Sequence, residues 1–318
     1  MGAPVRFPIK ATMADLQTSF RSTVNTWQCD ENEHLNVQFF TAFGDDASIH
    51  VLTALGFGPV AQGKAGLAVQ AQSDHIRYWQ ELRSEDAVEI VSAPVEVSAD
   101  RIVLYHELRN GFDNSLSATV LRAIGCRDAS GKAAPFPAAI VERAEAAMAA
   151  LPDHGKPRSA GRFGDLPALT PQQARDAGMR EINRCVVTPE ECDGAGNLRP
   201  RFHFSRFSDG AGMLWHGLGF DRIAMRDSHQ GTVVLETRTV YRRKIAIGTP
   251  TLVISGLLDF TDKTLHIGHL LFDVESGTLV ATSETVGVLF DQQARRSMAM
   301  SAEQRAKLVV IKPLRNGL

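Results

Sequence analysis

Four polar side chains at alternate positions, Asp30, Asn32, His34 and Asn36, are the group in this sequence whose types and spacing could do chemistry. A carboxylate can act as a general base or a nucleophile, and an imidazole or an amide can orient a substrate or a water molecule. The group stands directly before an apolar-rich stretch, so we expect it to lie in the loop that enters a helix. The first backbone N–H groups of a helix have no partner within it and carry partial positive charge. Such an arrangement is suited to attack on a carbonyl carbon, with the helix start as the oxyanion hole.

The helix that must position these residues follows them immediately. Asn36 is the expected N-cap. Gly56 and Gly58 are expected to end the helix, and Pro59 prevents it from continuing. The expected buried face has apolar residues three and four apart: Phe39, Phe40, Phe43, Ala47, Val51, Leu52 and Leu55.

Length and composition suggest two globular domains and exclude several classes of function. The 318 residues are 44% hydrophobic and 22% charged, with a formal net charge of −2, and clustered basic charge typical of nucleic-acid binding is absent from the sequence. No apolar run approaches the length of a membrane span, and the N-terminus lacks the apolar core of a signal peptide. The four cysteines have no metal-type spacing and are too few for a disulfide scaffold. We therefore expect a cytoplasmic protein with no nucleic-acid or membrane partner and no metal site.

Strand patterns follow the first helix. Stretches rich in Val, Ile and Thr at 87–97, 101–108 and 115–125 are separated by turn residues and predict an antiparallel sheet. A long helix followed by several such strands indicates an α+β domain, over residues 15–130, with the sheet packed on the helix. Residues 1–14 are expected to form a leader.

A change of composition separates this domain from the next. Residues 131–180 contain an Ala-rich stretch that predicts a helix over 138–151, followed by a Gly- and Pro-rich linker that is expected to cross the surface. A second domain is expected over 181–295. The tail, 296–318, is expected to form a helix from Ser301, with Gln304 as its capping-box partner.

The second domain repeats the first. Asp30 and Asp193 differ by 193 − 30 = 163 positions, and the same offset relates Gly56 to Gly219. A helix is again expected after the polar loop, with Pro200 in its first turn. The strands expected after it are 231–243, 251–260, 264–274 and 278–291.

The first motif resembles the signature of hotdog-fold thioesterases. The resemblance rests on Trp27, the Asp30-x-Asn32-x-His34-x-Asn36 pattern, Phe40 and Ala47, and on a second block of His75, Arg77, Tyr78, Glu81, Leu82, Asp86 and Val88. It implies two tandem hotdog domains, each a long central helix wrapped by an antiparallel sheet, paired as a pseudo-dimer. It covers most of residues 15–128 and, more weakly, 181–291.

The resemblance also implies roles for the residues. Asp30 matches the catalytic Asp of 4-hydroxybenzoyl-CoA-type thioesterases, and the Asp-x-Asn-x-His pattern is similar to that of plant acyl-ACP thioesterases. Asp30 would activate water or attack the carbonyl itself, and the sequence leaves both routes open. Asn32 and His34 would orient the carboxylate or the water. The expected substrate-binding residues are Asn36, Val37, Gln38 and Phe40.

The chain departs from the family pattern at several points. In the plant enzymes the motif lies in the later hotdog, whereas here the earlier one holds it. Glu33 stands where the family usually has Gly before the His, and Val37 replaces the second Asn of its usual pair. In the second copy Asp193 is kept, but Asn197 replaces the imidazole. We therefore expect one intact site and a second, altered site at Asp193 and Asn197.

These patterns predict a thioester hydrolase that acts on acyl-CoA, or on acyl-ACP, with water as co-substrate and no cofactor. A homo-oligomer is expected. One alternative is a hotdog hydratase or dehydratase, although the Asp–His spacing argues against it. The other is a non-catalytic acyl-CoA-binding protein. The Glu33 departure is the one feature that keeps it open, because the sequence has no output module of the kind that a sensor normally carries.

Overall fold

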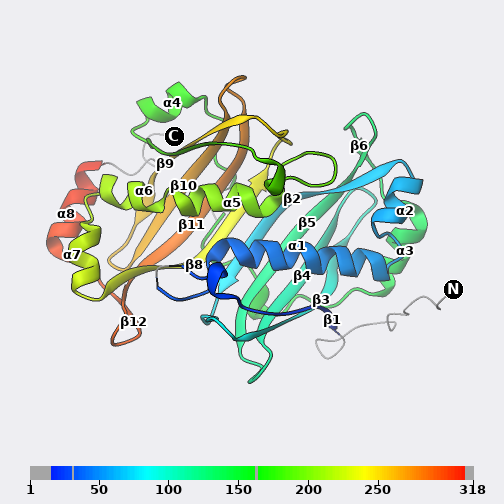
Figure 1. Ribbon diagram of the computed structural model, residues 1–318, viewed down its shortest axis with the longest axis horizontal. Helices are drawn as coiled ribbons and strands as arrows, with labels where there is room; N and C mark the ends of the chain where they lie inside the picture. The colour runs from blue at the N-terminus through cyan, green and yellow to red at the C-terminus, as the bar shows by residue number, and fades with distance from the viewer. Residues whose placement is uncertain (1–15, 31, 162–163, 312–318) are drawn as a thin grey trace. The chain divides into compact units, whose positions relative to one another are not determined.

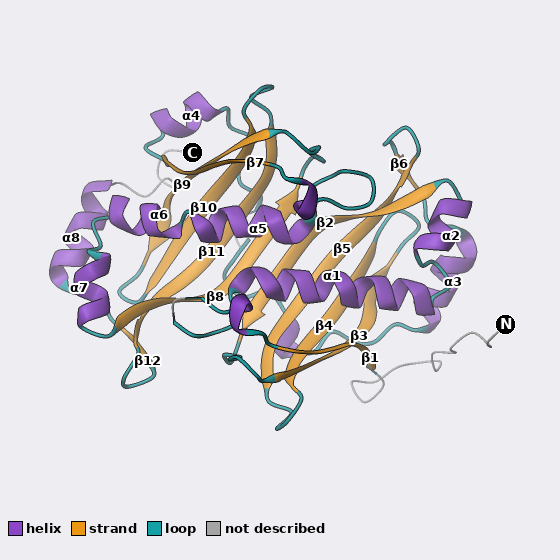
Figure 2. Cartoon of the chain, in the orientation of Figure 1, coloured by secondary structure: helices purple, strands orange, loops and turns teal. Residues whose placement is uncertain are grey.

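The computed structural model describes residues 16–30, 32–161 and 164–311. The expected leader, 1–14, and the last part of the expected tail, 312–318, lie outside these ranges. The chain divides into two compact units between Pro157 and Arg158. Within the described ranges each unit combines a principal helix with six paired antiparallel strands. Figures 1 and 2 show these helices and strands, and the arrangement is the predicted α+β class.

The first unit is organised around α1 (Val37–Ala54), which lies over its strands in Figure 1. The strands pair in the order β1-β3-β4-β5-β2. Phe40 and Phe43 on α1 pack in one buried cluster with Ile76 and Val120, so the expected apolar face of the helix meets the sheet. The elements are β1 (Gln17–Thr23), β2 (Leu67–Tyr78), β3 (Ala87–Val97), β4 (Ile102–Asn110), β5 (Leu116–Asp128), β6 (Ala133–Ala134), α2 (Pro59–Lys64) and α3 (Ala138–Ala146), with 3-10 turns η2 (Thr26–Gln28) and η3 (Asp153–Gly155).

The second unit follows the same plan with a broken helix. Its strands pair in the order β8-β11-β10-β9-β7. The helix is interrupted at Gly210, where an added Cβ would lie 2.9 Å from the backbone oxygen of Ile182. Ala47 stands at the corresponding position of the unbroken α1. The elements are α4 (Pro171–Asp176), β7 (Arg180–Val186), η4 (Pro189–Glu191), α5 (Pro200–Asp209), α6 (Ala211–Gly217), α7 (Arg222–Asp227), β8 (Gln230–Tyr241), β9 (Pro250–Phe260), β10 (Thr264–Asp273), β11 (Leu279–Asp291), β12 (Arg296–Met298) and α8 (Ala302–Ile311).

The strands of the two units share their irregularities as well as their order. Four strand pairs in each unit have a register shift that leaves one residue as a β-bulge. Every bulge of the second unit lies 163 positions after a bulge of the first, so the backbone confirms the offset seen in the sequence. The paired positions are Ser19 and Ile182, Gln72 and Leu235, Val95 and Leu258, and Ser117 and Val280.

The helix predicted over 138–151 ends five residues early, because α3 stops at Ala146. The Ala147 N–H closes the last turn, and the Ala149 N–H then donates to the Pro94 carbonyl of β3 at 2.9 Å. This tertiary hydrogen bond overrides the helix propensity of the Ala-rich stretch. The tail helix begins as predicted, with the Ser301 N–H and the Gln304 N–H each bonded to the other residue's side chain.

The segment after α3 is not simply the surface linker that its composition predicts. Gly155 packs against Tyr105 of β4 so closely that an added Cβ would lie 2.5 Å from the ring. His154 Nε2 lies 2.7 Å from the Glu107 carboxylate. Tyr105 and Glu107 alternate along β4 with residues that face α1, so this segment covers the opposite face of the sheet.

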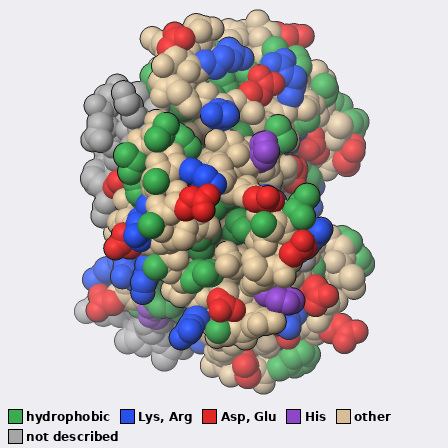
Figure 3. Space-filling view, turned by 90° about the vertical axis from the view of Figure 1, so that its left-hand side faces the viewer, with side chains coloured by type: hydrophobic (Ala, Val, Ile, Leu, Met, Phe, Trp, Pro, Cys, Tyr) green, Lys and Arg blue, Asp and Glu red, His purple; other side chains and the backbone are tan. Residues whose placement is uncertain are grey.

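No helix in the described ranges is both long and apolar enough to cross a membrane. On the face drawn in Figure 3, acidic and basic side chains are interspersed rather than gathered by sign. This agrees with the near balance of 34 basic and 36 acidic residues in the sequence.

Candidate active site

The loop before α1 is folded around the Asp30 carboxylate. Its Oδ1 accepts hydrogen bonds from the N–H groups of Asn32 at 2.8 Å and His34 at 3.3 Å. The Asp30 N–H in turn donates to the His34 carbonyl at 2.8 Å. These contacts form an Asx turn, which holds the half-buried carboxylate in one orientation.

The His34 imidazole lies near the carboxylate of Glu81, which follows just past the end of β2. Its Nε2 lies 3.4 Å from Glu81 Oε2, and the two side chains are only 12% and 24% exposed. The Leu35 N–H donates to the Leu82 carbonyl at 2.7 Å, which ties the loop to the same segment. Glu81 is thus a further member of the candidate site beside Asp30 and His34. The sequence indicated it only as a member of the second family block.

The start of α1 is capped as expected. Asn36 Oδ1 accepts the Gln38 N–H at 3.1 Å. Of the two amides expected to face an oxyanion, that of Gln38 is therefore engaged by the cap. The Val37 amide is the other donor that the sequence led us to expect at the helix start.

The side chain of Phe40, one of the expected substrate-binding residues, lies in the core of the first unit. Its side chain is 4% exposed, and its ring packs edge-on against Tyr78 at a centroid distance of 5.1 Å. Phe40 therefore helps to fix α1 on the sheet.

The loop of the second unit has the same backbone and different chemistry. Asp193 Oδ1 accepts the N–H groups of Ala195 and Asn197, both at 2.9 Å. Asn197 occupies the position of the imidazole, and Lys244 lies 163 positions after Glu81. At these three positions the second unit thus has an acid, an amide and a cation, where the first unit has an acid, an imidazole and an acid.

The same comparison explains the Glu33 departure. Glu33 has φ +63°, and Gly196, its counterpart in the second unit, has φ +76°. The loop requires a left-handed residue here, which Gly adopts freely and Glu adopts with strain. Glu33 therefore reproduces the backbone that the family's usual glycine would give.

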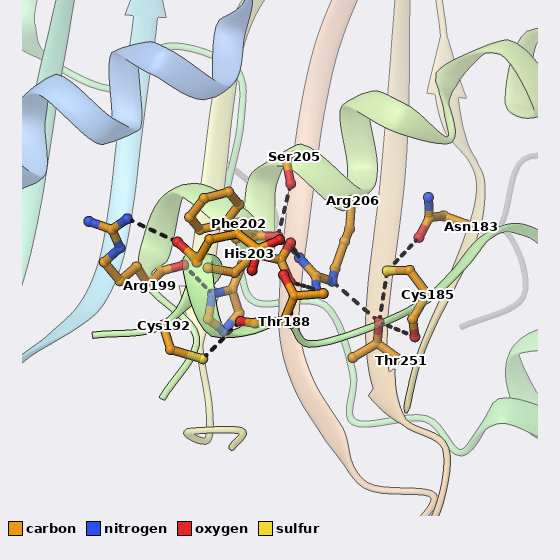
Figure 4. Close-up of polar contacts among 12 residues, drawn as sticks. Asn183, Cys185, Thr188, Cys192, Arg199, Phe202, His203, Ser205, Arg206 and Thr251 are labelled. Carbon is orange, nitrogen blue, oxygen red and sulfur yellow. Dashed lines mark hydrogen bonds and ion pairs between the residues drawn. The ribbon is translucent and has the colours of Figure 1, made fainter. Parts of the chain in front are cut away.

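The buried Arg206 forms an ion pair with the half-buried Glu191 next to the second loop, and Figure 4 shows Arg206 with its contact to Thr251. Arg206 of α5 donates to both oxygens of Glu191, at 3.0 and 2.9 Å, and its Nε donates to Thr251 at 3.3 Å. Burial opposes the charge of Glu191, but the hydrogen bonds from Arg206 outweigh it and hold the pKa of this carboxyl below its usual value. The corresponding residues of the first unit, Gln28 and Phe43, are uncharged.

Within the described part of the chain, no three His, Cys, Asp or Glu side chains are gathered so that they could hold a metal ion. The first loop itself carries a carboxylate, which can transfer a proton or act as a nucleophile, and an imidazole.

Comparisons with known proteins agree with the two-unit fold. A family model described as the thioesterase-like superfamily matches residues 24–144 and again residues 187–308. Comparison with curated protein sequences gives no match.

Three similar solved structures cover both units. A putative oleoyl thioesterase from Lactobacillus plantarum has a TM-score of 0.66 and 11% identity, over 86% of this chain and 97% of that one. An acyl-ACP thioesterase from Bacteroides thetaiotaomicron has a TM-score of 0.62 and 9% identity, over 86% and 97%. The 12:0-ACP thioesterase from Umbellularia californica has a TM-score of 0.62 and 12% identity, over 84% and 93%. At these identities the structural matches establish the fold alone, and they confirm the two tandem hotdog units.

Proposed function

The chain belongs to the thioesterase-like superfamily and is a thioester hydrolase, and we propose that its first unit hydrolyses acyl-CoA with Asp30 as the base or nucleophile. The observation that carries this proposal is the contrast between the two loops. Both fold the same Asx turn, but only the first places an imidazole, His34, beside a second acid, Glu81.

The proposed reaction needs a proton acceptor, an oxyanion donor and a leaving thiol. In the general-base route the Asp30 carboxylate takes a proton from water as the water oxygen bonds to the thioester carbon. The Val37 amide and the positive end of α1 stabilise the oxyanion. When the C–S bond breaks, the thiolate takes the proton from Asp30. In the nucleophilic route Asp30 bonds to that carbon first, the C–S bond breaks and the thiolate leaves, which gives an anhydride. Water then cleaves the anhydride to the acid and the free Asp30 carboxylate, and the proton released goes to the thiolate.

Asn32 and His34 complete the proposed site. The His34–Glu81 contact at 3.4 Å limits rotation of the imidazole. With its ring held in this way, His34 would orient the water or polarise the substrate carbonyl. Asn36 contributes by capping the helix whose start holds the oxyanion.

Coenzyme A is the proposed carrier, and acyl-ACP is the alternative. The sequence has no evident basic patch for docking an acidic carrier protein. Two of the similar structures are named as thioesterases of acyl-ACP, but their identity to this chain is too low to transfer that substrate. Parallel assays with one acyl group on both carriers decide between them.

The altered second site, Asp193 and Asn197, is proposed to contribute little to turnover. Location in the cytoplasm and self-association of the 34.6 kDa chain are also part of the proposal. Light scattering on the purified chain measures its oligomeric state directly.

The test of the proposed function is thiol release from a panel of acyl-CoAs by the purified full chain. The Asp30→Asn variant keeps an acceptor for the turn and loses the base, so its rate should fall by about 10²- to 10⁴-fold. Asp113→Asn is the matched control, because Asp113 also accepts an N–H two residues on, from Ser115 at 2.9 Å, in a hairpin outside the site. Its rate should stay at the wild-type level.

The same assay separates the two alternatives. Hydration of an enoyl-CoA without thiol release would indicate a hydratase. Saturable acyl-CoA binding with no turnover would indicate a binding protein. Either result would overturn the proposal, as would an Asp30→Asn variant with wild-type turnover.

A further inference from the structure

A guanidinium buried beneath α1 joins three elements of the first unit. Arg122 of β5 donates from Nε and Nη2 to the two oxygens of Asp74 on β2, both at 2.7 Å. Its Nη1 donates to Asp45 Oδ1 on α1 at 2.6 Å, and its Nη2 donates to the Thr41 carbonyl at 3.3 Å. One side chain therefore binds two successive turns of α1 to the sheet.

Burying the charges of this ion cluster costs the fold hydration free energy. The side chains of Arg122 and Asp74 are 1% and 2% exposed, and that of Asp45 is 28% exposed. Burying each charge costs several kcal/mol of hydration, and replacing such a set by neutral residues is often neutral or stabilising. Stability alone therefore does not explain why the charges are there.

The second unit contains the corresponding neutral set. Thr285, Thr237 and Ser208 lie 163 positions after Arg122, Asp74 and Asp45. Thr237 pairs with Thr285 across β8 and β11, just as Asp74 pairs with Arg122 across β2 and β5. The same strand order and bulges thus form without the charges.

Two of the three elements that Arg122 joins, α1 and β2, also position the candidate site. α1 begins at Val37, whose amide is the proposed oxyanion donor. β2 leads, just past its end, to Glu81 and Leu82, which hold His34 and Leu35 of the loop. The contacts therefore form a closed ring from α1 to β2, on to the loop, and back to α1. A shift of α1 along β2 would change the distance between the loop and the helix start.

We propose that Arg122 is a positioning residue, which sets α1 against β2 and thereby holds the helix start in line with the Asp30–His34 loop. It acts through the helix rather than on the substrate. This inference rests on the proposed function of Asp30.

The test gives the first unit the residues of the second. The triple variant Asp45→Ser, Asp74→Thr and Arg122→Thr removes all three charges of the cluster together, so the chain should fold with a melting temperature within about 5 °C of the wild type. Since a misplacement of about 1 Å can cost on the order of 10²-fold, kcat should fall by about 10- to 100-fold. KM should change by less than about threefold, because the substrate contacts remain.

Asp45→Ser alone is the second variant. It keeps the bidentate Arg122–Asp74 pair and removes one of the two contacts to α1, so it should fold normally. Its kcat should lie between those of the wild type and the triple variant. A loss as large as that of Asp30→Asn would instead make Asp45 a reacting group and overturn the positioning role.

The matched control removes the buried ion pair of the second unit, with Glu191→Gln and Arg206→Met together. Its kcat should stay within about twofold of the wild type. A control that lowers kcat as much as the triple variant would overturn the inference, and so would a triple variant that fails to fold or keeps full kcat. If Asp30→Asn is inactive while the triple variant is fully active, only this inference fails. If Asp30→Asn is fully active, the proposed function fails first.

Discussion

The Asp30 side chain combines a structural and a proposed chemical role, and the repeat separates them. Asp193 accepts hydrogen bonds from the backbone N–H groups two and four residues after it, as Asp30 does. Turn formation is therefore common to both units and is no evidence for catalysis. The chemical role depends on what differs, which is the imidazole of His34 in place of Asn197.

Glu33 offers a test of strain in this loop. A non-Gly residue at φ +63° is strained by about 1 kcal/mol or more. Glu33→Gly should therefore raise the free energy of unfolding by about 0.5–1 kcal/mol, part of the relief being offset by the greater chain entropy of glycine. Urea unfolding measures this change.

The reverse substitution is the control. Gly196→Ala at φ +76° should destabilise the chain by about 1 kcal/mol. An unchanged midpoint in both variants would show that the loop is not strained in solution.

The sequence indicated those residues of the candidate site that lie close together in the chain, and it did not show how distant residues join them. Asp30, Asn32, His34 and Asn36 are close together in the chain, so the motif could be read directly. Glu81 lies in the second family block, but only the pairing of Leu35 with Leu82 brings it to His34. The Arg122 cluster could not be predicted, since strand register alone joins residues so far apart.

At the scale of elements, the start of α1 is held by its cap. Asn36→Ala removes the 3.1 Å bond to the Gln38 N–H and should cost about 1 kcal/mol of unfolding free energy. Asn36→Asp keeps a capping oxygen and should cost much less. Chemical unfolding of both variants checks this, and equal losses would mean that the amide is needed for something other than the cap.

The broken helix of the second unit provides a matched glycine pair. An added Cβ at Gly210 would lie 2.7–2.9 Å from atoms of Ile182, whereas one at Gly212 of α6 would meet nothing within 4 Å. Gly210→Ala should therefore destabilise the chain by about 1–3 kcal/mol. Gly212→Ala should stabilise it by up to about 1 kcal/mol. Melting temperatures moving in the same direction would contradict the stated cause of the break.

Strand prediction succeeded where the apolar pattern was strong. β3 to β5 and β8 to β11 coincide with stretches rich in Val, Ile and Thr. β1 (QTSFRST) and β7 (REINRCV) were missed, because each is mostly polar and lies at one end of its strand order. An edge strand pairs on one side only, so its sequence carries little of the burial pattern that predicts strands.

At the scale of the whole chain, the two units keep one backbone plan and differ in their buried charges. The bulges recur at the same offset, yet the first unit anchors its helix from the sheet through Arg122. The second unit anchors its loop from the helix through Arg206. The fold class and the repeat could be predicted from the sequence, because the apolar pattern and the 163-residue offset indicate them. The different ion pairs of the two units could not be predicted, because they depend on which residues the strand register brings together.

Glu107 should make stability depend on acid pH. Burial opposes its charge, but hydrogen bonds from His154, Arg109 and Tyr105 outweigh burial and hold its pKa below the usual value. A glutamate in the unfolded chain has a pKa of about 4.3, which is above that of Glu107 in the folded protein. As the pH falls, the unfolded chain therefore takes up the proton first. The free energy of unfolding should then fall as the pH drops toward the pKa of the folded state.

Urea unfolding between about pH 3 and pH 6 measures this slope. Glu107→Gln cannot titrate and should show a shallower decrease over the same range, with lower stability at neutral pH. Parallel curves for the two proteins would exclude Glu107 as a source of the acid sensitivity.

The most direct test of the whole account is the ratio of two rates of thiol release from one acyl-CoA, Asp193→Asn over Asp30→Asn. Both substitutions preserve an Asx turn, so the comparison isolates the chemistry of the two loops. We predict that Asp193→Asn keeps nearly wild-type turnover while Asp30→Asn loses about 10²- to 10⁴-fold. Equal losses would contradict the assignment of the reaction to the first unit, and a larger loss for Asp193→Asn would move the site to the second.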